Sequence, residues 1–358
     1  MYSFLACAYN VHNETGHPYG YFIACQKAVE KTDNHFHAYI SKSASLPSIP
    51  HSWKLWFRYN FAKECRAFFR EGEGKRIFFL ESFHRIEFQA FALSALLLAG
   101  KHDRIWIVYR DELSSKHIKL RIKIFFLTWL LRFRFGNRFC LFSDSRYIAR
   151  YLSRKYHCHV TYLPFPNTDL VVQPFGKSDA NPIRCSWPGY PNPAKGERVI
   201  CQLVQSEDPK ACYFSLDVNQ ETKLPSNRGK IAIFSRKAHL SRSEYLTSLN
   251  QADVVWLPYD GKIYRWRTSG IFVEAVLMGK IPLVQKGSWL ALELKRYKLN
   301  ELIVDWNSNV FFSRLHVLLN EPEIYRKLQT MQDDYRSVHS LERFNALIKE
   351  QIEDQITA

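Results

Sequence analysis

Strand-like and helix-like segments alternate along the first half of this chain, and this alternation constrains the fold more than any other feature. Short apolar runs predict strands at 2–9, 76–80, 104–109, 138–142 and 160–163. Helical spacing predicts helices at 19–31, 87–99, 116–135 and from Arg146, with Ser143 as the cap of the last one and a loop at 10–18. A strand–helix–strand series of this kind predicts a parallel sheet covered by helices on both faces.

The alternation stops in a stretch rich in Pro, Asn, Asp, Gly and Ser and then begins again. New strands are expected at 182–187, 211–216, 230–234, 254–257 and 281–284, and new helices at 196–204, 241–250, 270–278 and 321–355. A chain of 358 residues also exceeds the roughly 250–300 residues that one core usually serves. We therefore expect a first domain at 1–166, a linker at 167–184, a second domain at 185–340, and a C-terminal helix at 341–358 that packs back on the first domain.

The charge is uneven along the chain. The net charge is +16, and residues 1–175 hold 25 Lys and Arg against 13 Asp and Glu, which places +12 in the first half. A basic first half favours an anionic partner such as a phosphorylated substrate, an anionic lipid or a nucleic acid. A charge that only keeps the protein soluble would give the same count.

The cysteines and the apolar runs predict where in the cell the protein is located. The eight cysteines form no C-x-x-C pair, and most lie within apolar runs, as free thiols do in a reducing compartment. The longest apolar stretches, 88–100 and 124–131, fall short of the ~20 residues that span a bilayer, and the first ten residues lack the basic start of a signal peptide. We expect a cytoplasmic protein, peripheral on the inner face of the membrane.

The segment 252–284 carries the sharpest chemical signal. An apolar strand ends at Pro258, a polar loop follows, and Ser269-Gly270 begins a helix. The first N–H groups of a helix and its dipole favour an anion. Arg265 and Arg267 add positive charge, Glu274 lies one turn further on, where it could accept from sugar hydroxyls, and Gly279 ends the helix. An ordinary strand–loop–helix with a serine cap and solvated arginines would also explain the pattern.

This segment resembles the nucleotide-sugar site of GT-B glycosyltransferases, and of the retaining family four in particular. The family pattern is a strand ending in Pro-Ser or Pro-Tyr, a loop, a Ser-Gly-like helix start, Glu-Ala, a Gly and Pro-Val. By this resemblance Glu274 binds the ribose, and Ser269 and Gly270 face the diphosphate. An earlier family glutamate is replaced here by Trp266. The resemblance assigns the following residues of the segment to donor binding: Tyr259, Tyr264, Arg265, Arg267, Ser269, Gly270 and Glu274.

Two further segments resemble the same family. Residues 187–196 are similar to the loop that opens the donor domain, which makes Gly189 and Lys195 donor-binding residues and Lys195 the phosphate ligand. The arginine expected with this lysine is replaced by Tyr190. Gly16 and His17 follow the first strand, where the family often has Gly-Gly or Gly-His, and the resemblance places them on the acceptor side. A surface loop histidine is an equally good explanation of His17.

The catalytic group is less clearly marked. The family places a histidine after the strand equivalent to 104–109, and Arg110 and Asp111 occupy that position here. Arg110 could hold a phosphate, and Asp111 could act as a base or position the sugar. His84, which follows the neighbouring strand, is the other candidate. A structural ion pair between Arg110 and Asp111 is the competing interpretation.

The resemblance implies the fold and the reaction. The fold would be α/β of the GT-B type, with two Rossmann-like doubly wound parallel-sheet domains and the active site in the cleft between them. The enzyme would move a sugar from a nucleotide-sugar donor to a glycan or lipid-linked acceptor, in the synthesis of a cell-surface polysaccharide or glycolipid. It would need no metal ion and no cofactor, and it would not bind nucleic acid. Family four retains the anomeric configuration of the sugar. The alternatives are a non-catalytic GT-B-like protein that binds glycan or nucleic acid, and a nucleotide-sugar epimerase.

Two basic aromatic segments, 53–70 and 116–135, are the expected sites of contact with a membrane surface. Lys and Arg flank and interrupt their apolar residues, a composition that suits an anionic lipid surface. For the octet 124–131 itself, burial in the protein core is the expectation that we adopt.

Overall fold

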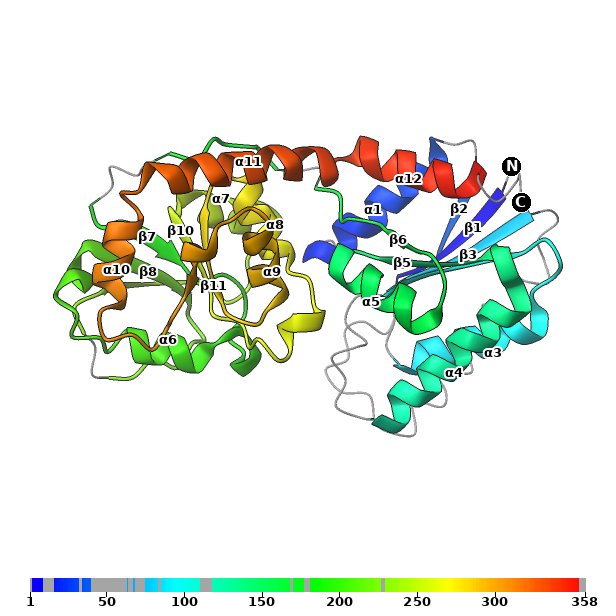
Figure 1. Ribbon diagram of the computed structural model, residues 1–358, viewed down its shortest axis with the longest axis horizontal. Coiled ribbons are helices and arrows are strands. Elements are labelled where there is room, and N and C mark those ends of the chain that lie inside the picture. Colours follow the sequence, from blue (N-terminus) through cyan, green and yellow to red (C-terminus); the bar gives the residue numbers. More distant parts are fainter. Residues whose placement is uncertain are drawn as a thin grey trace. The chain divides into compact units, whose positions relative to one another are not determined.

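The computed structural model describes residues 2–8, 16–31, 34–39, 63, 67, 75–82, 85–109, 118–167, 170–176, 181–226 and 229–353. Contacts divide the chain into two compact units (Figure 1). The first unit comprises Met1–Thr168 and His339–Ala358, and the second comprises Asp169–Val338. Each unit is built on one six-stranded sheet in which every pair of neighbouring strands is parallel.

The first sheet has the strand order β2-β1-β3-β4-β5-β6. Its strands are β1 (Tyr2–Ala8), β2 (His35–Tyr39), β3 (Lys75–Ser82), β4 (Arg104–Tyr109), β5 (Phe139–Ser143) and β6 (Val160–Tyr162). Every residue of β4 and β5 is buried, as expected for central strands covered on both faces. The chain order reverses between β1 and β3, so the topological switch point of this unit lies there.

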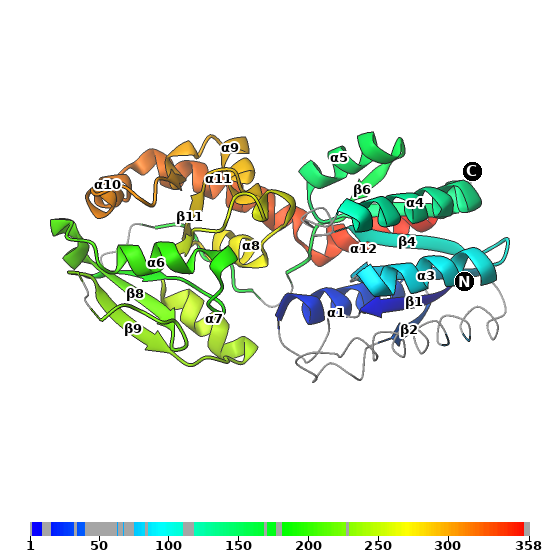
Figure 2. The same cartoon turned by 90° about the horizontal axis from the view of Figure 1, so that it is seen from below.

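Helices cover both faces of the first sheet (Figures 1 and 2). They are α1 (Gly16–Glu30), α3 (Arg85–Leu98), α4 (Ile118–Phe135), α5 (Arg146–Tyr156) and α12 (Leu341–Glu353). On one face, side chains of α1 and α12 share a buried core with Phe4, Phe79 and Trp106. On the other face, Phe91 of α3 packs on Phe78, and the hydroxyl of Tyr109 bonds to Thr128 of α4 at 2.6 Å.

The C-terminal helix α12 completes the first unit. Phe344, Leu347, Ile348 and Ile352 belong to its buried core. Arg104 of β4 donates to the carbonyl oxygen of Ile352 at 3.0 Å. The last helix of the chain is therefore a structural part of the unit that the first strand begins.

The second sheet has the order β12-β11-β10-β7-β8-β9. Its strands are β7 (Ile183–Ser186), β8 (Phe214–Asn219), β9 (Ala232–Arg236), β10 (Val254–Leu257), β11 (Ile281–Gln285) and β12 (Ile303–Val304). Its helices are α6 (Glu197–Leu203), α7 (Arg242–Gln251), α8 (Gly270–Leu277), α9 (Trp289–Arg296), α10 (Phe311–Leu318) and α11 (Pro322–Val338). The order reverses between β7 and β10, and this switch point organises the candidate site.

The predicted α/β class and the parallel sheets are confirmed, and several element boundaries are corrected. Helix α1 begins at Gly16, so 16–18 form its first turn and not a loop. The cap of α5 is Ser145, whose hydroxyl accepts from the N–H of Ile148, while Ser143 ends β5. Residues 209–213 form a 3₁₀ turn capped by Asp208, so the strand expected from 211 begins at Phe214. Two residues of the expected linker, 183 and 184, already pair with β8.

Among the strands and α-helices of the described ranges, four have no counterpart in the prediction: β2, β12, α9 and α10. Strand β2 is short and alternates His, Phe and Ala, a pattern without a continuous apolar run. Strand β12 has two residues, and α9 and α10 have eight each. Elements of this length give too few periods for a sequence pattern to identify them.

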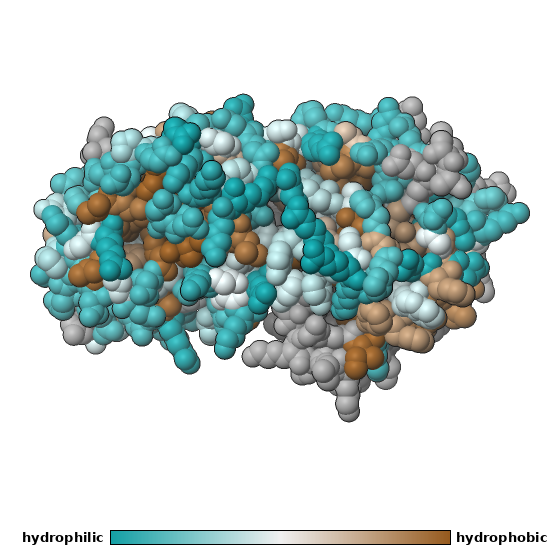
Figure 3. All heavy atoms as spheres, in the orientation of Figure 1, coloured by the Kyte–Doolittle hydropathy of each residue, from teal (hydrophilic) through white to brown (hydrophobic). Residues whose placement is uncertain are grey.

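Helix α4 contradicts the expectation that the octet 124–131 is core. Ile124, Thr128 and Leu131 are buried, but Phe126 is 55% exposed and Trp129 is 47% exposed. The exposed apolar residues of α3 and α4 are Leu93, Leu97, Ile122, Phe125, Phe126, Trp129 and Phe133. Apolar residues gather over these two helices in Figure 3. We call this set the α3–α4 apolar surface.

Candidate functional site

The candidate site lies at the switch point of the second unit, between the carboxyl ends of β7 and β10. In open parallel sheets, ligands bind outside the carboxyl ends of the strands where the strand order reverses. The segments that leave these two ends are 187–196 and 258–269, and the second leads directly into α8. Both were selected from the sequence as donor-binding segments, and the topology brings them to one place.

Close backbone contacts join the two segments. Gly196 has φ +86°, and a Cβ added to it would meet the carbonyl oxygen of Pro258 at 2.2 Å. The N–H of Asp260 donates to the carbonyl oxygen of Ala194 at 2.9 Å. The indole N–H of Trp187 donates to the carbonyl oxygen of Lys195 at 3.1 Å. Only glycine fits at 196, because any side chain would occupy the position of the neighbouring backbone.

Gly189 and Lys195 form the centre of the site. Gly189 has φ +95°, and a Cβ added to it would meet Nζ of Lys195 at 2.9 Å and Cδ1 of Ile271 at 3.6 Å. The lysine ammonium group therefore lies against the bare Cα of Gly189. Because Ile271 belongs to the first turn of α8, the same contacts bring Lys195 close to the helix start at Ser269-Gly270.

Arg236, at the end of β9, supplies a second positive charge that the sequence analysis missed. Its guanidinium donates to the carbonyl oxygens of Trp187 at 2.8 Å and Gly189 at 3.3 Å. It also bonds to the carboxylate of Asp217 at 3.0 Å. Tyr190, where the family places an arginine, is exposed and stacks on the ring of His239. The arginine absent from position 190 thus has a counterpart on β9, two strands away from β7 in the sheet.

The electrostatic setting of Lys195 favours an anion. Burial lowers the pKa of Lys195, and the positive charge of Arg236 lowers it further. At the start of α8, Ser269 accepts from the N–H of Phe272 at 3.2 Å, which satisfies one of the four N–H groups that a first turn leaves without helical partners. Asp217 already balances the charge of Arg236, so an anionic ligand would balance the charge of Lys195 beside the first turn of α8.

Glu274 is fully buried and bonded to two side chains of α7. The carboxylate accepts from Nη1 of Arg242 at 2.6 Å and from the hydroxyl of Tyr245 at 2.7 Å. Burial raises the pKa of Tyr245, and the negative charge of Glu274 raises it further. The residue lies one turn inside α8, as predicted, but its partners come from a helix that the sequence analysis did not connect with it.

The remaining donor-side candidates belong to the segment 258–269, which follows β10. The ring centroids of Tyr259 and Tyr264 lie 4.4 Å apart. Burial raises the pKa of Tyr259, and the nearby Tyr264 raises it further. Arg265 is exposed, with its guanidinium 5.5 Å from the ring centre of Trp266. Arg267 is half-buried. Gly279 ends α8 as expected, because its φ of +70° favours glycine. A Cβ there would also meet the carbonyl oxygen of Gln173 at 2.5 Å.

The candidates of the first unit are placed only in part. Gly16 and His17 begin α1, the helix that follows β1 in the chain. His84, Arg110 and Asp111 lie outside the described residues, as do all but two positions of 53–70. No group of three metal-ligating side chains occurs in the described part of the chain.

The missed residues share a sequence signal. Arg236 ends a strand, and Arg242 and Tyr245 lie in the first turn of the helix that follows it. The carboxyl ends of parallel strands gather at one edge of the sheet. A search for charged residues within two positions of the end of every predicted strand would have found Arg236, because the predicted strand 230–234 ends two residues before it.

Comparison with known proteins shows similarity in structure but not in sequence. No family model matches the chain, and no curated protein sequence matches it. Solved structures match it over nearly its whole length. One, described as OtsA in its apo form, has 9% identity and a TM-score of 0.63 and covers 98% of both chains.

Two other matches are glycosyltransferases of different kinds. An α,α-trehalose-phosphate synthase (UDP-forming) from Burkholderia vietnamiensis has 8% identity and a TM-score of 0.61 and covers 100% of both chains. An α-glucosyltransferase in complex with UDP and a 13-mer DNA has 13% identity and a TM-score of 0.53 and covers 99% of both chains. The two six-stranded parallel sheets and these full-length matches show that the chain has the GT-B fold.

Proposed function

We propose that this protein is a glycosyltransferase that moves a sugar from a nucleotide-sugar donor to a glycan or lipid-linked acceptor. The observation that carries the proposal is the ammonium group of Lys195 lying against Gly189 at the switch point of the second unit. A cation beside a bare backbone lets a diphosphate approach both the charge and the chain. The GT-B fold supports the same function.

The chemistry that we assign to the site is electrostatic. When the sugar leaves, negative charge develops on the nucleoside diphosphate. Lys195, Arg236 and the first turn of α8 would stabilise that charge without rearranging, because they are held in place before the substrate arrives. We propose that the reaction needs no metal ion and no cofactor beyond the nucleotide sugar. Retention of configuration and membership of family four stay predictions.

Glu274 is assigned to the ribose of the donor. Its two oxygens already accept from Arg242 and Tyr245, and a carboxylate offers about four acceptor positions. Because the carboxylate is fully buried, a ribose hydroxyl would reach it by displacing one of these two partners from α7. In this arrangement Arg242 and Tyr245 position the carboxylate, and donor binding depends on α7 as well as on α8.

The first unit is assigned to the acceptor. Gly16 and His17 at the start of α1 are the proposed acceptor-side residues, and Arg110, Asp111 and His84 are the proposed catalytic candidates. We assign synthesis of a cell-surface polysaccharide or glycolipid to the enzyme, at the inner face of the membrane. The α3–α4 apolar surface supports this location, because large exposed apolar patches mark interaction sites. None of the described helices has both the length and the apolar composition to cross a bilayer.

A DNA acceptor is the second candidate. The net charge of +16 favours a polyanionic partner, and one similar structure contains UDP together with DNA. The exposed aromatic residues of α4 favour lipid over DNA, so the lipid-linked acceptor is preferred. Salt-sensitive binding of random duplex DNA, without binding to lipid vesicles, would reverse this preference.

The direct test is calorimetric titration with UDP, GDP, ADP, CDP and dTDP. We expect one nucleotide to bind, and Lys195→Met to weaken it by about tenfold or more, since a charged hydrogen bond contributes about 1.5–3 kcal/mol. Lys295→Met is the matched control, because Lys295 is an exposed lysine at the end of α9. Failure of all five nucleotides to bind would contradict the proposal. Release of the selected nucleotide from its sugar conjugates would then identify the donor sugar.

A further inference from the structure

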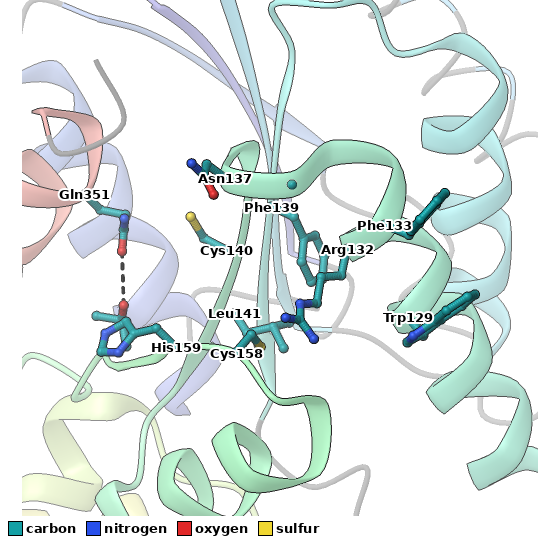
Figure 4. Close-up of a pocket in the computed structure, with 12 residues that line it drawn as sticks. Trp129, Arg132, Phe133, Asn137, Phe139, Cys140, Leu141, Cys158, His159 and Gln351 are labelled. Atoms are coloured by element: carbon teal, nitrogen blue, oxygen red, sulfur yellow. Dashed lines mark hydrogen bonds between the residues drawn. The ribbon is translucent and has the colours of Figure 1, made fainter. Parts of the chain in front are cut away.

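A second cavity lies in the first unit, at the amino end of β5. Its volume is about 690 Å³, and it is bounded by α4, the start of β5, the segment before β6, and α12 (Figure 4). The proposed donor-binding and catalytic residues follow the carboxyl ends of the strands, at the opposite edge of a sheet from the amino ends. Because β5 has five residues and a strand rises ~3.3 Å per residue, the first and last residues of the strand are separated by roughly 13 Å. The cavity is therefore distinct from the carboxyl-end edge of this sheet, and its lining residues all belong to the first unit.

The walls of the cavity differ in chemistry. Figure 4 shows Trp129 and Phe133 on one side and Gln351 and His159 on the other. The rings of Trp129 and Phe133 are nearly parallel, with centroids 5.8 Å apart. The hydroxyl of Thr161 donates to the amide oxygen of Gln351 at 3.0 Å. This bond fixes the amide and leaves its NH₂ group available to a ligand.

The polar groups are mostly uncharged. Asn137 and His159 line the cavity, are exposed, and make no hydrogen bond within the described part of the chain. The one strong cation of the lining, Arg132, donates to the carbonyl oxygen of Tyr156. None of the described residues that line the cavity is Asp or Glu. Amide and imidazole groups that both donate and accept suit hydroxyl groups better than a phosphate, and aromatic faces suit the C–H face of a sugar ring.

The cavity opens onto the α3–α4 apolar surface. Phe126 stacks on Trp129, with ring centroids 6.3 Å apart, and Trp129 stacks on Phe133. Trp129 and Phe133 thus belong both to the cavity and to the exposed row of rings. A ligand whose polar part fills the cavity would place an attached alkyl chain along that row.

We propose that this cavity binds the uncharged sugar head group of a glycolipid, with the alkyl chain on the α3–α4 apolar surface. The cavity volume of about 690 Å³ falls within the range of small-molecule sites. The cavity lies away from the carboxyl ends of the strands, so a glycolipid bound there anchors the protein and does not present the reacting hydroxyl. The proposal does not depend on the donor site of the second unit.

The test compares amphiphiles with one chain and different heads. The full-length protein is titrated calorimetrically with octyl glucoside, octyl galactoside and octyl mannoside, and with octylphosphocholine. We expect at least one octyl glycoside to bind about fivefold or more tightly than octylphosphocholine, because several head-group hydrogen bonds are added to the same chain contact. Asn137→Ala and Gln351→Ala should reduce that affinity to the octylphosphocholine level.

The controls separate the cavity from other sites. Asn250→Ala, an exposed change on α7 of the other unit, should leave the preference unchanged. Phe126→Ala, on the row of rings but outside the cavity lining, should weaken all four amphiphiles alike. Equal affinity for all four, or a sugar preference that survives both Asn137→Ala and Gln351→Ala, would overturn the proposal.

Discussion

The guanidinium of Arg242 lies 2.6 Å from the carboxylate of Glu274, so α7 and α8 are joined by an ion pair whose acidic member is fully buried. Tyr245 donates to the other carboxylate oxygen at 2.7 Å. The residue assigned to the ribose is therefore also a structural link between two helices. Any change of Glu274 will affect stability as well as donor binding, and its tests must separate the two.

We expect Glu274→Ala to lower the free energy of unfolding by about 3 kcal/mol or more, because Arg242 and Tyr245 would lose a buried partner. Chemical denaturation at pH 7 measures this change. Glu342→Ala, at an exposed position in the first turn of α12, is the control and should cost far less. A Glu274→Ala protein as stable as the control would mean that the ion pair has no structural role.

Gly189→Ala tests the centre of the donor site. The added methyl group would meet Nζ of Lys195 at 2.9 Å, at a backbone angle of φ +95°. We expect a loss of about 1–3 kcal/mol in stability from backbone strain and a clear loss of nucleotide affinity from the displaced ammonium group. Gly176→Ala is the matched control, because a Cβ there meets nothing within 4 Å. If Gly189→Ala binds the nucleotide with unchanged affinity in calorimetry, the assignment of Lys195 to nucleotide binding is wrong.

The lowered pKa of Lys195 predicts the pH dependence of donor binding. An anion binds the protonated lysine, so affinity should fall as the pH rises through the lowered pKa, below the usual range for lysine. Lys195→Arg should keep its affinity to higher pH, because arginine stays protonated. Titrations between pH 7 and pH 10 on both proteins measure the difference. Parallel curves would show that Lys195 does not contact the nucleotide.

The cap of α7 predicts a second pH dependence, in stability. Glu244 accepts from the N–H of Ser241 at 2.9 Å, and this bond, with the nearby Lys237, lowers the pKa of Glu244 to about 2. A carboxyl group with a depressed folded pKa stabilises the protein above its unfolded pKa, and this contribution is lost as the pH falls toward 2. Glu244→Gln should make the free energy of unfolding depend less steeply on pH between pH 4.5 and pH 2. An unchanged slope would contradict the capping box.

The α3–α4 apolar surface predicts binding to anionic vesicles. Leu97 is 81% exposed, so Leu97→Ser and Phe126→Ser should reduce sedimentation with phosphatidylglycerol vesicles while leaving thermal stability nearly unchanged. Val317→Ser, at a similarly exposed apolar position of α10 in the other unit, is the matched control. Equal sedimentation of all four proteins, or none by the unaltered protein, would argue against a membrane role.

The sequence predicted the parts of this protein that local interactions determine. The strands at 104–109 and 254–257 are fully buried apolar runs, and the structure reproduces both ranges. The end of α8 follows from Gly279, whose positive φ favours glycine. The donor-side segments 187–196 and 252–284 were found because their glycines, prolines and helix starts lie close together along the chain.

Only the tertiary structure decided which charges meet. Arg236 binds the carbonyl oxygen of Trp187, 49 positions away, and Arg242 binds Glu274 across 32 positions. The same holds for α4, whose apolar residues occur all round the helix, so its packing partners select the buried face. Contacts of this kind depend on strand order and helix packing, which bring distant residues together, and no periodicity or spacing along the chain records them.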